Sequence, residues 1–169
     1  MKNAILSLLL IFAITTKVIA QEKLSNTEVF IQLLESRETD FKDIMKEKMN
    51  NASSNPAEVS YASKIGFGAA KESVNVDETN KTAFFMSYFD YKNNIMEPVR
   101  SGPVIDDLLK IVNSPTVNKM YKVTDITADN GDIITQVNDQ KDNMIMSMTT
   151  TSGNKAFYII FFGKSFDAK

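Results

Sequence analysis

The sequence predicts a single α+β domain in which two helices pack on one face of an antiparallel β-sheet. Two stretches carry apolar residues at steps of three and four, which is typical of amphipathic helices. The other apolar stretches follow a period of two and are separated by turn-forming residues, which is typical of strands joined by hairpins. The resulting order, about α-β-β-β-α-β-β-β-β, segregates helices from strands and therefore favours an α+β fold.

Residues 1–20 have the pattern of a secretory signal peptide. Lys2 supplies a positive charge, residues 4–14 form the apolar stretch, and Val18-Ile19-Ala20 fits a small-residue cleavage site. The apolar stretch is shorter than the roughly 20 residues that a membrane-spanning helix needs. We therefore expect no membrane span, cleavage near Ala20, and an exported domain of residues 21–169 that is periplasmic or secreted.

Composition excludes several kinds of chemistry. Without Lys2 and Lys17 the chain has 17 basic and 21 acidic residues, a net charge of −4, so we expect no binding to nucleic acid. The chain contains no cysteine and no histidine. This removes thiol chemistry, the Ser-His-Asp arrangement and the usual zinc ligands. The sequence therefore predicts a non-catalytic protein with no metal and no cofactor.

The first predicted helix begins after Ser25, because Ser25 and Glu28 have the spacing of a capping box. Its apolar face runs to Met49, and the turn-forming residues 50–56 end it. Its face consists of Phe30, Leu33, Leu34, Phe41, Ile44, Met45 and Met49, with Arg37 as the one polar member.

Three strands follow this helix. Residues 59–67 alternate between apolar and polar or small side chains, which predicts a half-buried strand. Residues 73–77 are expected to pair with residues 82–91 through the polar loop at 78–81. The latter strand is apolar on both faces at its start, which places it in the centre of the sheet.

The second helix is expected within residues 95–113, best formed from Pro103 to Val112, and ended by Asn113-Ser114-Pro115. Four strands follow, at residues 120–127, 132–138, 143–150 and 155–163. Asn130-Gly131 predicts a two-residue type I′ turn between the first two of them, and Ser152-Gly153 a turn between the last two. No internal repeat and no domain boundary is visible in the sequence.

Four motifs with a chemical precedent are better explained by structure. Ser152 and Lys155 have S-x-x-K spacing, but on a hairpin turn rather than a helix. Gly66-Phe67-Gly68 lacks the third glycine of a dinucleotide site, and close strand packing or a bulge explains it better. Residues 125–132 hold Asp125, Asp129, Asn130 and Asp132 without EF-hand spacing, and a solvated turn is the simpler explanation; the sequence leaves cation binding there open. Asp106 and Asp107 are adjacent on a helix and so do not share a site.

The aromatic and methionine content of the strands exceeds what one covered face of a sheet needs. Residues 157–162 are apolar on both faces, so partial sheet closure, a partner protein or an apolar ligand is expected to cover the second face. Methionines suit adaptable contacts, although they more often fill gaps in a core. The candidate binding surface is Tyr88, Tyr91, Met144, Met146, Met148, Tyr158 and Phe162.

These observations favour an exported, non-enzymatic binding domain whose partner is an envelope or extracellular protein, in the manner of an inhibitor or immunity protein. A carrier or sensor of an apolar small molecule or lipid is one alternative. An enzyme that uses only Asp, Glu, Tyr or Lys is another. The sequence leaves the oligomeric state open.

Overall fold

The computed structural model describes residues 24–36, 40–50, 57–69, 71–77, 79–92, 97–153 and 155–163. The predicted signal peptide and its cleavage site lie outside these residues. The helices are α2 (Asn26–Glu35), α3 (Phe41–Ile44), α4 (Glu97–Val112) and α5 (Pro115–Met120). The strands are β1 (Met45–Lys48), β2 (Glu58–Ser63), β3 (Lys71–Asp77), β4 (Thr82–Asp90), β5 (Lys122–Thr127), β6 (Ile133–Asn138), β7 (Met144–Thr150) and β8 (Ala156–Phe162).

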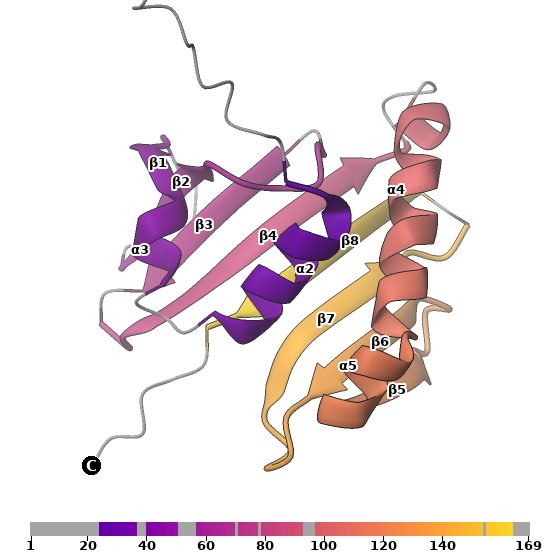
Figure 1. Cartoon of the computed structure of the whole chain (residues 1–169). Coiled ribbons are helices and arrows are strands. Elements are labelled where there is room, and N and C mark those ends of the chain that lie inside the picture. Colours follow the sequence, from indigo (N-terminus) through magenta and orange to yellow (C-terminus); the bar gives the residue numbers. More distant parts are fainter. Residues whose placement is uncertain are drawn as a thin grey trace, which may run out of the picture.

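The strands form one open antiparallel sheet with the order β1-β2-β3-β4-β8-β7-β6-β5 (Figure 1). Strands that follow one another along the chain pair as hairpins, except that β4 pairs with β8 at the centre. Helices α2 and α4 contact each other and cross in front of the same face of the sheet (Figure 1). The predicted α+β class, with helices on one face of an antiparallel sheet, is confirmed.

The two halves of the chain repeat the same order of elements. Each half has a longer helix, a short helix and a four-stranded meander, and the last strand of each meander lies at the centre of the sheet. The helices cross over between the halves, because α2 contacts β8 and α4 contacts β4. Neither half therefore encloses its own core. The repeat lies in the topology, although none is visible in the sequence.

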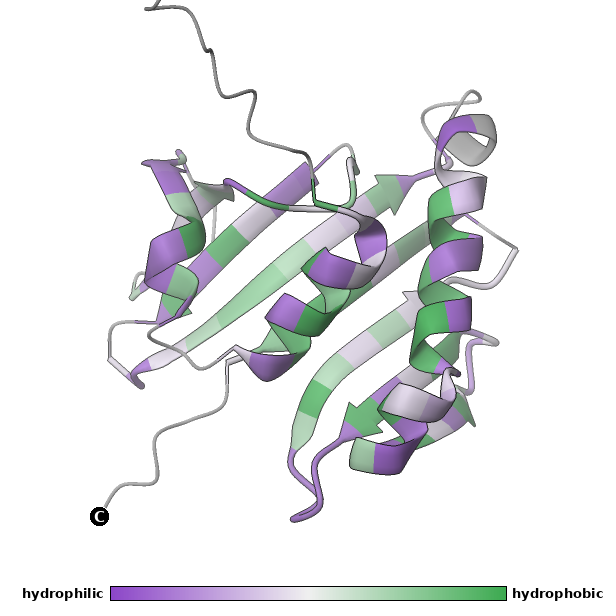
Figure 2. Cartoon of the chain, viewed as in Figure 1, coloured by the Kyte–Doolittle hydropathy of each residue, from purple (hydrophilic) through white to green (hydrophobic). Residues whose placement is uncertain are grey.

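The core lies between the helices and the covered face of the sheet. The odd-numbered residues of β4 and β8 face the helices and are buried. Phe161 is fully buried among other aromatic rings, with centroid distances of 5.2 Å to Phe30, 6.2 Å to Phe67 and 6.2 Å to Phe85. Figure 2 shows that hydrophilic residues concentrate in loops such as the one between β6 and β7.

The capping box at the start of α2 is confirmed. Ser25 N donates to the Glu28 carboxylate at 2.8 Å, and Glu28 N donates to Ser25 Oγ at 3.3 Å. The predicted continuation of this helix to Met49 is wrong, because α2 ends at Glu35 and residues 45–48 form strand β1. The helical spacing of Phe41 and Ile44 belongs to the separate short helix α3. Residues 51–56, the predicted turn, lie outside the described residues.

The second helix lies within the predicted range 95–113, although its well-formed part begins earlier than expected. Helix α4 starts at Glu97 and contains Pro103, whereas the best-formed part was expected to start at Pro103. The predicted stop at residues 113–115 is confirmed, since α4 ends at Val112. Ser114 then caps α5 by accepting from Val117 N at 3.4 Å, so residues 115–120 are helical and the next strand starts at Lys122 rather than Met120.

The turn at Asn130-Gly131 is longer than the predicted two-residue type I′ turn. Gly131 has a positive φ of 82°, but Asn130 does not. Gly131 N donates to Ala128 O at 2.8 Å, and Ala128 N donates to Asp132 O at 2.9 Å. This pattern is a type I turn followed by a glycine in a bulge, which closes a three-residue hairpin loop.

The loop before β3 explains the first glycine of the sequence Gly66-Phe67-Gly68. Phe67 is buried and packs against the rings of Phe85 and Phe161. Its backbone N–H donates to the Glu72 carboxylate at 2.5 Å, and that carboxylate also accepts the Ser87 hydroxyl at 2.9 Å. The carboxylate lies directly against Gly66, where a Cβ atom would collide with it. Close packing, as expected, accounts for this glycine.

Candidate functional site

The two faces of the sheet are occupied differently. Along β4, buried and half-buried side chains alternate from Ala83 to Asp90, and the buried set faces the helices. In the pairing of β4 with β8, the half-buried residues of β4 lie opposite the even-numbered residues of β8 and on the same side of the sheet. We call this second side of the sheet the open face, because the helices of the described residues pack on the opposite side (Figure 1).

Large apolar and aromatic side chains form a patch at the centre of the open face. Three cross-strand pairs build it, and the rings of Phe84 and Phe162 have centroids 6.4 Å apart. The six members are half-buried. The open-face patch consists of Phe84, Met86 and Tyr88 from β4, paired with Phe162, Ile160 and Tyr158 from β8.

Polar side chains flank the patch on the β3 side, and they bond mainly to one another. Asn75 Nδ2 donates to Ser73 Oγ at 3.1 Å, and the Ser60 hydroxyl donates to the Asn75 carbonyl oxygen. The Lys71 ammonium lies 5.9 Å from the centroid of the Tyr88 ring, which is within cation–π range. The flank therefore borders the patch on one side with buried polar groups that satisfy one another.

The structure brings together three of the seven residues predicted for a binding surface. Tyr88, Tyr158 and Phe162 lie in the open-face patch. Met146 and Met148 are buried under the helices, in the gap-filling role that methionines more often have. The two others lie apart from the patch, since Met144 is exposed at the start of β7 and Tyr91 is half-buried beside α4, where Ser101 Oγ donates to its hydroxyl at 3.5 Å.

Sequence reasoning missed Phe84, Met86 and Ile160. They are separated from Tyr88 or Tyr158 by an even number of residues, so they lie on the same face of their strand. Choosing Tyr88 and Tyr158 could therefore have led to all three. The register that sets Met86 opposite Ile160 joins strands far apart in the chain and leaves no local signal.

The acidic hairpin has its own internal bonds. The Asp125 carboxylate accepts the Thr135 hydroxyl at 2.6 Å, and the Asp132 carboxylate accepts Ser152 N at 2.7 Å. Ser152 lies on the turn between β7 and β8, as predicted. In the described part of the chain, no three acidic side chains come close enough to hold a metal ion.

No helix among the described residues has the length and apolarity needed to cross a membrane.

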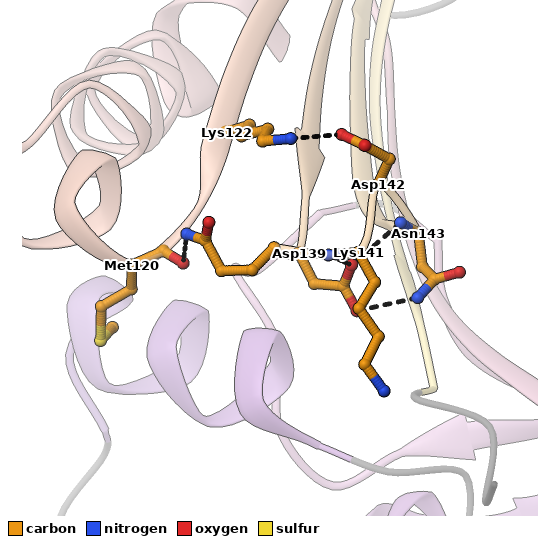
Figure 3. A network of polar contacts seen from close by, with 7 residues as sticks. Met120, Lys122, Asp139, Lys141, Asp142 and Asn143 are labelled. Carbon is orange, nitrogen blue, oxygen red and sulfur yellow. Dashed lines mark hydrogen bonds and ion pairs between the residues drawn. The ribbon is translucent and has the colours of Figure 1, made fainter.

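A polar network fixes the β6–β7 loop to the start of β5 (Figure 3). The Asp139 carboxylate accepts Lys141 N at 2.8 Å, Asn143 N at 2.9 Å and Asn143 Nδ2 at 3.0 Å. Lys122 Nζ forms an ion pair with the Asp142 carboxylate at 2.6 Å. Gln140 Nε2 donates to Met120 O at 2.8 Å (Figure 3).

This network predicts an acid-dependent loss of stability. Hydrogen bonds from the Asn143 side chain, and then from backbone N–H groups, lower the pKa of Asp139. A carboxyl whose pKa is lowered by folding stabilises the protein above its unfolded pKa of about 4, and the stabilisation is lost as pH falls through the folded pKa. We expect Asp139→Asn to lower the free energy of unfolding at neutral pH, with the difference from wild type narrowing below about pH 4.

Urea unfolding at a series of pH values measures this difference. Asn143→Ala removes the strongest donor to Asp139 and should show the same trend. A difference between wild type and Asp139→Asn that stays constant down to the lowest pH contradicts the prediction.

Comparison with known proteins yields no relative for this chain: no family model, no curated protein and no solved structure matches it. The function therefore has to be inferred from the surface itself.

Proposed function

We propose that this protein is a non-catalytic binding domain that holds a partner protein on the open-face patch. The observation that carries this proposal is the set of six large apolar and aromatic side chains at the centre of a sheet face that the described helices do not cover. A patch of this kind on a soluble domain is typical of an interaction surface.

The chemistry of the patch supports a protein partner. Aromatic residues and methionine are enriched in the centres of protein interfaces, where charged residues are depleted. The patch contains two tyrosines, which combine a large apolar ring with a polar tip, and no charged residue. Because the sheet is open, with β1 and β5 at its edges, the patch lies on an extended surface rather than inside a closed barrel. An extended surface suits a protein partner better than an enclosed apolar ligand.

We also propose that the protein acts outside the cytoplasm, in the periplasm or the medium. Support comes from Lys2, the apolar residues 4–14 and the small-residue site at 18–20. The partner would then be an envelope or extracellular protein. Intact-mass measurement of the protein recovered from its own cells tests this point, because export predicts a chain that starts at or near Gln21.

Site-specific photo-crosslinking tests the binding surface. A photoreactive phenylalanine analogue placed at Tyr158 or at Phe162 is expected to capture one and the same protein from the cell envelope. The matched control places the analogue at Leu109, which is 39% exposed on α4 and belongs to the helical layer. We expect this control to capture little or none of that protein, because a photoreactive group on α4 would have no atom of the partner within reach.

A double variant of the patch separates a loss of binding from a loss of folding. Met86 and Ile160 face each other on the patch, so Met86→Glu with Ile160→Lys places two charges where the partner is expected, while their opposite signs support the pairing of the strands. Loss of capture with an unchanged circular dichroism spectrum supports the proposal. Equal capture from Leu109 and Tyr158 contradicts it. Co-purified lipid without captured protein would favour the carrier alternative instead.

A further inference from the structure

The two edges of the sheet differ in how well they are protected against pairing with another strand. Edge strand β1 is four residues long, and its pairing with β2 contains a register shift. Three of its residues, Lys46, Glu47 and Lys48, are charged and exposed. Short length, irregular pairing and exposed charge are the features by which natural proteins keep a sheet edge from accepting another strand.

Edge strand β5 lacks most of these features. It pairs with β6 residue for residue over its six residues without a register shift, and four of the six are Val, Thr or Ile. No strand in the described ranges pairs with its outer side. Backbone N–H and C=O groups of alternate residues point to that side, because an antiparallel strand directs its hydrogen bonds to both sides in turn.

Both charged side chains of β5 are engaged within the chain. Lys122 pairs with Asp142, and Asp125 accepts the Thr135 hydroxyl from the neighbouring strand. The network in Figure 3 also holds Met120, the last residue of α5, through the bond from Gln140 to Met120 O. Both charges of the edge strand therefore have partners within the chain.

An exposed apolar residue lies on this edge. Ile126 is 41% exposed and pairs with Ile134 on the open face. Suppose that β5 of a second copy pairs antiparallel with this edge about a two-fold axis. Side chains on the same face of the two strands then lie opposite each other, and the residue on the axis lies opposite its own copy. A register centred on Asp125 sets two carboxylates opposite each other, which is unfavourable. A register centred on Ile126 instead buries Ile126 against its copy and sets Asp125 opposite Thr127.

We infer that β5 is a self-association edge, where a second copy of this chain adds antiparallel across a two-fold axis at Ile126. The sheet then continues from one copy into the other at the C-terminal end of β5, where Asp125 lies opposite Thr127 and the outward backbone groups beside Ile126 gain partners. The contact of two short strands is at the low end of interface sizes, so the dimer is weak and reversible rather than obligate.

Disulfide crosslinking is a clean test, because the chain contains no cysteine. We expect Ile126→Cys to form a crosslinked dimer on mild oxidation, since the two copies of that residue face each other across the axis. The control Glu47→Cys places a thiol on the protected edge β1 and should remain monomeric. Equal crosslinking of the two variants overturns the inference, as does crosslinking of Thr124→Cys with none from Ile126→Cys.

Sedimentation velocity of the protein without added cysteine gives an independent readout. We expect the average mass to rise with concentration, and Ile126→Lys to raise the dissociation constant by about tenfold or more, because two ammonium groups then oppose each other. Glu47→Lys should leave it unchanged. A protein that stays monomeric over the whole range of concentration overturns the inference and leaves the open-face proposal standing, since that proposal rests on β4 and β8.

Discussion

Replacing Phe161 with alanine is expected to lower the free energy of unfolding by about 3–5 kcal/mol. Phe161 is fully buried, and its ring contacts those of Phe30, Phe67 and Phe85. It therefore joins helix α2, the loop before β3 and strand β4 to β8. Removing the ring leaves a cavity that elements on several sides would have to close together. Since domains of this size are stable by about 5–15 kcal/mol, the loss is a large share of the total.

Chemical denaturation followed by circular dichroism measures this loss. The matched control is Phe162→Ala, the next residue on the same strand, which lies on the open face and is half-buried. We expect the control to lose about 1 kcal/mol, because Phe162 is half-buried and its removal opens no enclosed cavity. Equal losses for the two variants would show that both faces of β8 are packed alike, which would also remove the reason for proposing a partner on the open face.

Replacing Gly66 with alanine is expected to destabilise the protein by about 1–3 kcal/mol. The new Cβ atom would collide with the Glu72 carboxylate, which lies directly against Gly66. That carboxylate is held by Phe67 N and by the hydroxyl of Ser87, which is fully buried. It therefore moves aside only by giving up these bonds and leaving a buried donor unsatisfied.

A double-mutant cycle tests this cause. Glu72→Ala removes the atoms that the new Cβ would meet, so Gly66→Ala in that background should cost less than in the wild type. The neighbouring Gly68 serves as a comparison. It has a φ of +80° and open space around its Cβ position, so the cost of Gly68→Ala is conformational and should be the same in both backgrounds. Strict additivity for Gly66 and Glu72 contradicts the collision.

Local patterns predicted most of the hairpins, the start of α2 and the end of α4. The alternation in residues 73–77 and 82–91, with a short polar loop between, was enough to pair β3 with β4. The start of α2 followed from the sequence in the same way, because Ser25 and Glu28 have the spacing of a capping box. These features depend on neighbours in the chain, which is why a single sequence contains them.

Strand β1 was mistaken for helix because its residues have no preference for a strand. Met45, Lys46, Glu47 and Lys48 all favour helices by intrinsic propensity, and Met45 continues the helical spacing of Ile44. Pairing with β2 overrides this preference, as Met45 lies opposite Ser63 and Lys48 opposite Tyr61. Tertiary contacts of this kind have no signature in the segment itself.

The candidate site, too, could be predicted from local patterns only in part. Alternation indicated that Met144, Met146 and Met148 share a face, but not which face the helices would cover. That choice is set by the pairing of Met148 with Ile159 on β8, on the side where the core lies. The patch itself depends on β4 meeting β8, a contact between the two halves of the chain.

The central place of β8 has a consequence for how the chain folds. Because β8 is the last described strand and pairs with both β4 and β7, the first half of the chain has no partner for its central edge until β8 has been made. Helix α2 likewise lacks the strand against which it packs. Pairing distant segments is slow, since loop closure must precede the contacts that stabilise it. A ribosome-bound chain would thus stay incompletely folded, with its apolar strands open to chaperones, until β8 became available.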